Sequence, residues 1–67
     1  MSDFSNNLKY YRLIKNMEQK ELAKQLSISK QTISHWETGY TEPSIQQLIE
    51  LADIFETTID ELVGRTL

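Results

Sequence analysis

Uncharged polar side chains that can form hydrogen bonds gather on one face of a short segment beginning at Lys30. They recur at the i, i+3, i+4, i+7 spacing of a helix and are Gln31, Ser34, His35 and Thr38. Ile33 and Trp36 lie three residues apart on the other face, which a short helix needs for docking against a core. A merely solvated face usually carries Glu and Lys, so this polar face indicates recognition of a ligand by hydrogen bonds.

Lys30 lies in the first turn of this helix, where unpaired N–H groups and the helix dipole disfavour a cation. A polyanion at this end would account for the lysine, because the backbone amides and the ammonium group would face phosphate together. The alternative is a solvated lysine that costs roughly a few tenths of a kcal/mol at an exposed helix end. This helix alone does not decide between the two interpretations.

The preceding segment, residues 19–26, predicts a second short helix. Leu22, Ala23 and Leu26 form one apolar stripe at helical spacing. Residues 27–29 then interrupt the pattern with two serines that flank a single isoleucine. The sequence therefore predicts two short helices joined by a tight turn.

These two helices resemble the helix-turn-helix of the Cro/C1 repressor family, also called XRE-like. The resemblance extends from about residue 8 to residue 62 and rests on the joint spacing of several positions, which are Gln19, Glu21-Leu22-Ala23, Leu26, Ile28-Ser29, Ile33-Ser34, Trp36-Glu37, Gly39 and Pro43-Ser44. It implies an all-α fold: a compact five-helix lambda-repressor-like DNA-binding domain with the helix-turn-helix at helices two and three. Ser27 departs from the usual glycine of the turn, where a positive φ is uncommon for other residues. Glu18 replaces the usual Ser or Thr cap, which predicts a weaker cap.

The resemblance also implies which side chains meet double-stranded DNA. The base-reading residues would be Ser29, Lys30, Gln31 and His35. The DNA-backbone contacts would come from Gln19, Thr32, Thr38, Tyr40 and Thr41. The chemistry is suitable, since glutamine pairs bidentately with adenine, lysine donates to guanine, and hydroxyl groups donate to phosphate. Glu42 is a departure, because a carboxylate near phosphate is unfavourable, and we expect it to point away.

One domain is expected over residues 1–67, with helices at about residues 6–15, 19–26, 30–37, 44–55 and 58–63. Ser5 is a plausible N-cap of the first helix, in which Leu8, Tyr11 and Ile14 share one face. Capping-box patterns at residues 44–47 and 58–61 open the last two helices. The fourth helix has two apolar flanks, so it is expected to be the central strut.

An ion pair between Arg12 and Glu37 is implied by the resemblance. The residues agree with it, because a guanidinium group can hold a carboxylate bidentately and brace two helices. The alternative for Arg12 is an ordinary surface position with a solvated head group.

The net charge of −3 is unusual for a DNA-binding protein, but the charges are unevenly distributed. Residues 1–36 carry six basic and three acidic residues, whereas residues 37–67 carry one basic and seven acidic residues. Such a dipolar molecule can present its basic end to DNA. The acidic half predicts only modest non-specific affinity.

Other chemistry is not indicated. There is no Cys, and the single His35 has no second strong ligand at metal-binding spacing, so we expect no metal and no cofactor. Without a nucleophile–base set or a glycine-rich phosphate loop, no catalytic residue, enzyme activity or small-molecule ligand is expected. No apolar run approaches the roughly 20 residues of a membrane span, and no signal peptide is evident. We expect a cytoplasmic protein that is either located at the bacterial nucleoid or encoded by a phage.

The predicted function is therefore sequence-specific DNA binding by a transcriptional regulator that acts as a repressor. One such domain reads only a few base pairs, so specificity implies a homodimer with half-sites about 34 Å apart or a multiple of it. The expected dimer surface lies in the C-terminal third and comprises Ile54, Phe55, Val63 and Leu67. The alternatives are an antitoxin component or a protein-interaction adaptor on the same fold. The acidic charge and Glu42 favour the adaptor, whereas the polar face with Lys30 opposes it.

Overall fold

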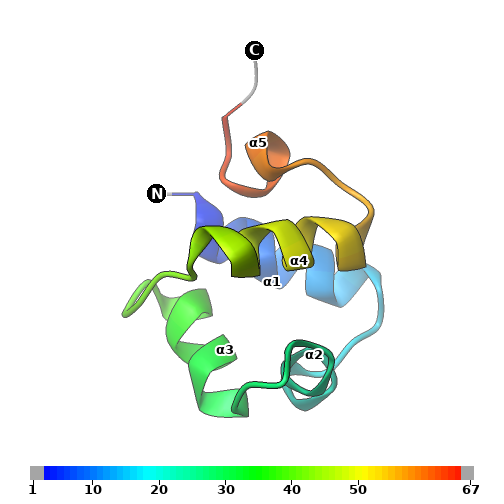
Figure 1. Ribbon diagram of the computed structural model, residues 1–67, viewed down its shortest axis with the longest axis vertical. Helices are drawn as coiled ribbons and strands as arrows, with labels where there is room; N and C mark the ends of the chain where they lie inside the picture. Colours follow the sequence, from blue (N-terminus) through cyan, green and yellow to red (C-terminus); the bar gives the residue numbers. More distant parts are fainter. Residues whose placement is uncertain (1–2, 66–67) are drawn as a thin grey trace.

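The structure is a computed structural model that describes residues 3–65. Within these residues the chain forms five helices. They are α1 (Phe4–Ile14), α2 (Gln19–Leu26), α3 (Lys30–Thr38), α4 (Ile45–Phe55) and α5 (Ile59–Leu62). In Figure 1, α1 and α4 form the middle of the molecule, with α2 and α3 on one side of them and α5 on the other. The expected all-α class with a helix-turn-helix at α2 and α3 is confirmed.

Serine and threonine caps fix the starts of three helices. The hydroxyl groups of Ser29, Ser44 and Thr58 each accept a hydrogen bond from the backbone N–H three residues later, at 3.1, 3.1 and 3.0 Å. Such side chains satisfy N–H groups that have no partner within the helix. The predicted starts at residues 44 and 58 therefore differ by one residue, because these positions are caps rather than helical residues.

The first helix begins earlier than predicted, and Ser5 is not its cap. Asp3 is the N-cap residue, and its carbonyl oxygen accepts a hydrogen bond from the amide of Asn7 at 2.9 Å. Phe4 is fully buried in the core. The burial of this aromatic ring draws the chain into helical conformation two residues before the predicted start.

The core lies between the helices and takes one face from each. Its buried apolar residues are Phe4, Leu8, Leu22, Ala23, Leu26, Ile33, Trp36, Leu48, Leu51, Phe55 and Leu62. Because Ile33 and Trp36 are among them, α3 is docked by its apolar face. The polar face of α3 is thereby turned away from the core.

Two apolar positions expected inside the protein are on its surface. Ile14 is 56% exposed, so only Leu8 and Tyr11 of its predicted face turn towards the core. Ile45, at the start of α4, is 76% exposed, so α4 buries one face and leaves the other outside. The central position expected of α4 is confirmed (Figure 1), but its second apolar flank is not covered: Ile49 is also 39% exposed, because the other helices pack only against the flank that carries Leu48, Leu51 and Phe55.

Three turns place a residue other than glycine in the left-handed region. Asn16, Ser27 and Glu56 have φ values of 55°, 57° and 55°. Asparagine tolerates this conformation well, and Ser27 keeps the turn geometry in which the family usually has glycine. Glu56 was not expected there; its carboxylate accepts a hydrogen bond from Lys15 at 2.8 Å.

Replacing Gly64 with alanine should destabilise the protein more than replacing Gly39. Both glycines have a positive φ, +82° and +79°, which costs about 1–2 kcal/mol for a side-chain-bearing residue. At Gly64 an added Cβ would also lie 2.7 Å from Cβ of Asp3, whereas at Gly39 the nearest atom is Oγ of Ser5 at 3.4 Å. We expect the Gly64 variant to be less stable by a further 1 kcal/mol, roughly, from this overlap. Thermal unfolding checks the order, and equal melting temperatures would contradict it.

Candidate nucleic-acid interface

The predicted base-reading residues lie at and beyond the start of α3. Ser29, Lys30 and Gln31 are exposed there, and His35 follows one turn later, half-buried. Gln31 and His35 share one side of the helix because they are four residues apart. The structure thus presents hydrogen-bonding groups along the outer side of α3.

Ser29 and Thr32 have a local role at this helix start. The Ser29 hydroxyl accepts a hydrogen bond from the Thr32 amide and lies 2.8 Å from the Thr32 hydroxyl. A hydroxyl group can both donate and accept, so capping occupies only part of its capacity. The cap shapes the helix end at which Lys30 and Gln31 are displayed.

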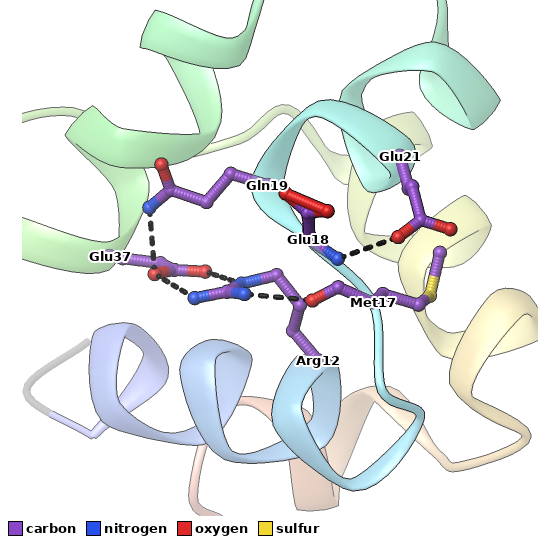
Figure 2. A network of polar contacts seen from close by, with 6 residues as sticks. All are labelled: Arg12, Met17, Glu18, Gln19, Glu21 and Glu37. Atoms are coloured by element: carbon purple, nitrogen blue, oxygen red, sulfur yellow. Dashed lines mark hydrogen bonds and ion pairs between the residues drawn. The ribbon is translucent and has the colours of Figure 1, made fainter.

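A buried network joins α1, α2 and α3 behind this surface (Figure 2). The guanidinium group of Arg12 donates to both carboxylate oxygens of Glu37, from Nε at 2.6 Å and from Nη2 at 3.1 Å. Its Nη1 donates to the backbone oxygen of Met17 at 2.8 Å. Arg12 is only 8% exposed, so the expected ion pair is present and is buried. The hydrogen bond to Glu37 raises the pKa of Arg12 above its ordinary value.

Gln19 extends this network to the start of α2. Its Nε2 donates to Oε1 of Glu37 at 3.1 Å. The side-chain amide has a second N–H and a carbonyl oxygen, so this contact does not exhaust its hydrogen bonds. The start of α2 is also supported by the amide of Glu18, which donates to Oε1 of Glu21 at 3.0 Å. This contact supplies support at the position where a weaker cap was expected.

The loop after α3 folds back over the last turn of the helix. Gly39 takes a left-handed conformation, its amide donates to the oxygen of Trp36, and the Tyr40 amide donates to the oxygen of His35 at 2.9 Å. These two hydrogen bonds form a Schellman motif. The hydroxyl group of Thr38 donates to the same His35 oxygen at 3.2 Å. Residues 38–41 are exposed, as is Glu42.

One feature of this loop was not foreseen from the sequence. The rings of His35 and Tyr40 contact edge to face, with centroids 4.8 Å apart. The sequence feature that could have predicted this contact is Gly39 at the end of the helix, because the residue after such a glycine often contacts the preceding helical turn.

The predicted dimer surface requires a correction. Phe55 is only 4% exposed, and its ring stacks on that of Tyr11 at 5.8 Å between centroids, so it belongs to the core rather than to the surface. Ile54 and Val63 are half-buried and pack against that core. Leu67 lies outside the described residues. Within residues 3–65, Ile54 and Val63 are therefore the two predicted dimer-surface residues that have part of their surface exposed.

Among residues 3–65, His, Asp and Glu side chains form no group of three that could hold a metal ion. Within the same residues, each helix is too short or too polar to span a bilayer.

Comparisons with known proteins agree with the fold. A family model described as helix-turn-helix (HTH_3) matches residues 8–62. The HTH-type transcriptional regulator AnsR of Bacillus subtilis is 47% identical over 51 residues, which are 76% of this chain and 44% of AnsR. The HTH-type transcriptional activator BcrR of Enterococcus faecalis is 39% identical over 62 residues, which are 92% of this chain and 30% of BcrR.

A solved structure has the same fold. The crystal structure of a transcriptional regulator from Listeria innocua superimposes with a TM-score of 0.89 at 33% identity and covers 96% of this chain. The chain spans 60% of that protein and less than half of AnsR and BcrR. The matched residues include both helices of the α2–α3 unit and the paired Arg12 and Glu37. The chain belongs to the helix-turn-helix family of transcriptional regulators of the Cro/C1 type.

Proposed function

We propose that this chain binds double-stranded DNA sequence-specifically as a homodimer and represses transcription, with α3 in the major groove of an operator half-site. The observation that carries the proposal is the two-sided character of α3. Ile33 and Trp36 are buried, while Lys30 and Gln31 are exposed at its start. A helix docked by one face and polar on the other is suited to entering the groove.

Each base-reading residue has a chemical role in this proposal. Gln31 offers an amide that can pair with adenine, and Lys30 offers a cation for guanine or for phosphate. Ser29 can donate or accept at the edge of the helix, and His35 reads further along the groove. With a phosphate at the start of α3, the cation of Lys30 has an anionic partner. Without such a partner, the helix dipole makes a cation at this position unfavourable.

Contacts to the DNA backbone would come from two places that flank α3. The side chain of Gln19 and the backbone amides at the start of α2 approach one phosphate. The side-chain amide of Gln19 is oriented by its hydrogen bond to Glu37, with 3.1 Å between Nε2 and Oε1. Thr32 and the loop residues Thr38, Tyr40 and Thr41 approach other phosphates. Such contacts fix the register of a protein on DNA, whereas contacts to base edges supply the sequence preference.

Repression follows in this proposal from occupancy of the operator. One α3 helix reads only a few base pairs, so two copies are needed to recognise a site with useful specificity. Among residues 3–65, Ile54 and Val63 are the residues that we propose contribute to the contact between the two copies. Two half-sites about 34 Å apart would place both α3 helices on the same side of the duplex.

A second candidate function is that of a protein-interaction adaptor, and one surface feature favours it. Tyr10, Leu13 and Ile14 lie on the outer side of α1 and are all more than half exposed. An apolar stripe of this kind is suited to contact with a protein. A regulator that binds both DNA and a protein partner would use both surfaces.

Selection of bound duplexes from a random library tests the proposed function. Enrichment of a two-fold symmetric motif with half-sites about one helical turn apart would support a dimeric DNA-binding regulator. Affinity for that duplex should fall as salt rises, because phosphate contacts release counterions. Repression is checked with a reporter gene that carries the selected motif across its promoter. Failure to enrich any motif would contradict the proposal and favour the adaptor.

A further inference from the structure

We infer that Tyr40 is a positioning residue whose ring holds the imidazole of His35 in the orientation that meets a base edge. The inference rests on the proposed function and deepens it, because it concerns how one base-reading side chain is prepared for DNA. The ring contact itself is present in the free protein, with centroids 4.8 Å apart and an angle of 61° between the planes.

The backbone of the loop brings the two rings together. The left-handed conformation of Gly39 reverses the chain directly after α3. The amide of Tyr40 then donates to the backbone oxygen of His35 at 2.9 Å, and the Thr38 hydroxyl and the Thr41 amide donate to the same oxygen. The residue that carries the reading imidazole is therefore also the residue on which the loop closes.

The position of Tyr40 is not explained by burial in the core. It is 76% exposed, whereas His35 is half-buried at the end of the reading face. An exposed aromatic ring that contacts a polar side chain contributes little apolar burial, but it restricts the rotamers of that side chain. A side chain ordered before binding loses less conformational entropy when it binds, which favours affinity and the selection of one base.

The hydroxyl group and the ring of Tyr40 can be separated by mutation. Tyr40→Phe removes the group that would donate to phosphate and keeps the ring, whereas Tyr40→Ala removes both. The DNA probe is the selected duplex, together with variants at each base pair of one half-site. His35→Ala identifies the base pair at which discrimination depends on the imidazole.

Three results are expected from these variants. Relative to Tyr40→Phe, Tyr40→Ala should bind the selected duplex about 2- to 10-fold more weakly, which is the effect of ordering one side chain. The loss should include discrimination at the base pair that His35→Ala identifies. In a protein that already carries His35→Ala, the further effect of Tyr40→Ala should largely disappear, because the effects of two residues that act through one contact are not additive.

Several outcomes would overturn the inference. Equal affinities of Tyr40→Phe and Tyr40→Ala would show that the ring contributes nothing. Additive effects with His35→Ala, or a uniform loss on all duplex variants, would assign Tyr40 to the DNA backbone alone. A His35→Ala protein that keeps every base preference would remove the role that Tyr40 supports. Failure of the selection to yield any duplex would instead count against the proposed function.

Loss of folding is controlled separately. Tyr40 is exposed, so Tyr40→Ala should retain the melting temperature of the parent within a few degrees. Tyr40→Leu provides a second variant that fills the same space without an aromatic ring. If it too loses discrimination at the His35 base pair while remaining folded, the edge-to-face contact is the feature required. Recovery by leucine would show that any bulky side chain suffices and would contradict the aromatic contact.

Discussion

Replacing Glu37 with alanine is expected to lower the free energy of unfolding by about 3–5 kcal/mol. The carboxylate accepts hydrogen bonds from Nε and Nη2 of Arg12 and from Nε2 of Gln19. Removing it leaves the guanidinium group buried, with the backbone oxygen of Met17 as its remaining acceptor among residues 3–65. Most of the expected loss is the cost of that unpaired buried charge, since an intact buried pair contributes much less.

The size of this effect makes it easy to measure. A chain of 67 residues has a total stability of about 3–10 kcal/mol, so the expected loss is a large fraction of the whole. At about 4–8 °C for each kcal/mol, the melting temperature should fall by more than 10 °C. Circular dichroism during heating checks this directly. A melting temperature within about 2 °C of the parent would show that the guanidinium group finds water or another acceptor.

Lys15 provides the matched control, because it also forms an ion pair between distant parts of the chain. Its Nζ lies 2.8 Å from Oε1 of Glu56, and the hydrogen bond from Lys15 lowers the pKa of that carboxyl group. Both side chains are solvent-exposed, however, so solvent and salt screen the pair. Lys15→Ala should therefore leave the melting temperature nearly unchanged. The contrast between the two variants measures the effect of burial on an ion pair.

The features that could be predicted from the sequence depend on local rules or on fixed spacing. Ser44 and Thr58 cap helices as expected, because a hydroxyl three residues before an unpaired N–H satisfies it whatever the rest of the fold does. The pair of Arg12 and Glu37 was implied by the resemblance and is present. Spacing along two helices is sufficient for such a pair only when the fold that brings them together is already known.

The errors concern which apolar residues face the core. Ile14 and Ile45 are exposed and Phe55 is buried, although all three belong to apolar helical patterns. Periodicity identifies a stripe, but where a helix has apolar residues on two flanks the packing of other helices decides which flank is covered. The burial of Phe55 beside Tyr11 depends on the contact between α4 and α1, which are far apart in sequence. The contact of His35 with Tyr40 likewise depends on the turn at Gly39.

Replacing Gln31 with alanine is expected to weaken binding to the selected duplex by about 1–3 kcal/mol, or roughly 5- to 150-fold. Gln31 is the second residue of α3 and is exposed, and its side-chain amide makes no hydrogen bond to another residue within 3–65. Its truncation should therefore not disturb the fold, and alanine is the better helix former. The loss would come from the base edge that its amide pairs with.

The matched control for this variant is Gln46→Ala. Gln46 is also the second residue of a helix, it is exposed, and its helix also follows a serine cap. The two substitutions thus remove the same side chain from the same helical position, and they differ only in whether the helix is proposed to enter the groove. Gln46→Ala should bind the duplex as the parent does.

The decisive measurement is the affinity of the Gln31 variant for duplexes changed at single base pairs. If Gln31 reads one base pair, the variant should lose preference at that position and keep it at the others, because its remaining contacts are unchanged. Its dependence on salt should remain that of the parent, since no phosphate contact has been removed. Preserved preference at every position, or an equal loss in Gln46→Ala, would show that the start of α3 is not the part of this chain that selects the sequence.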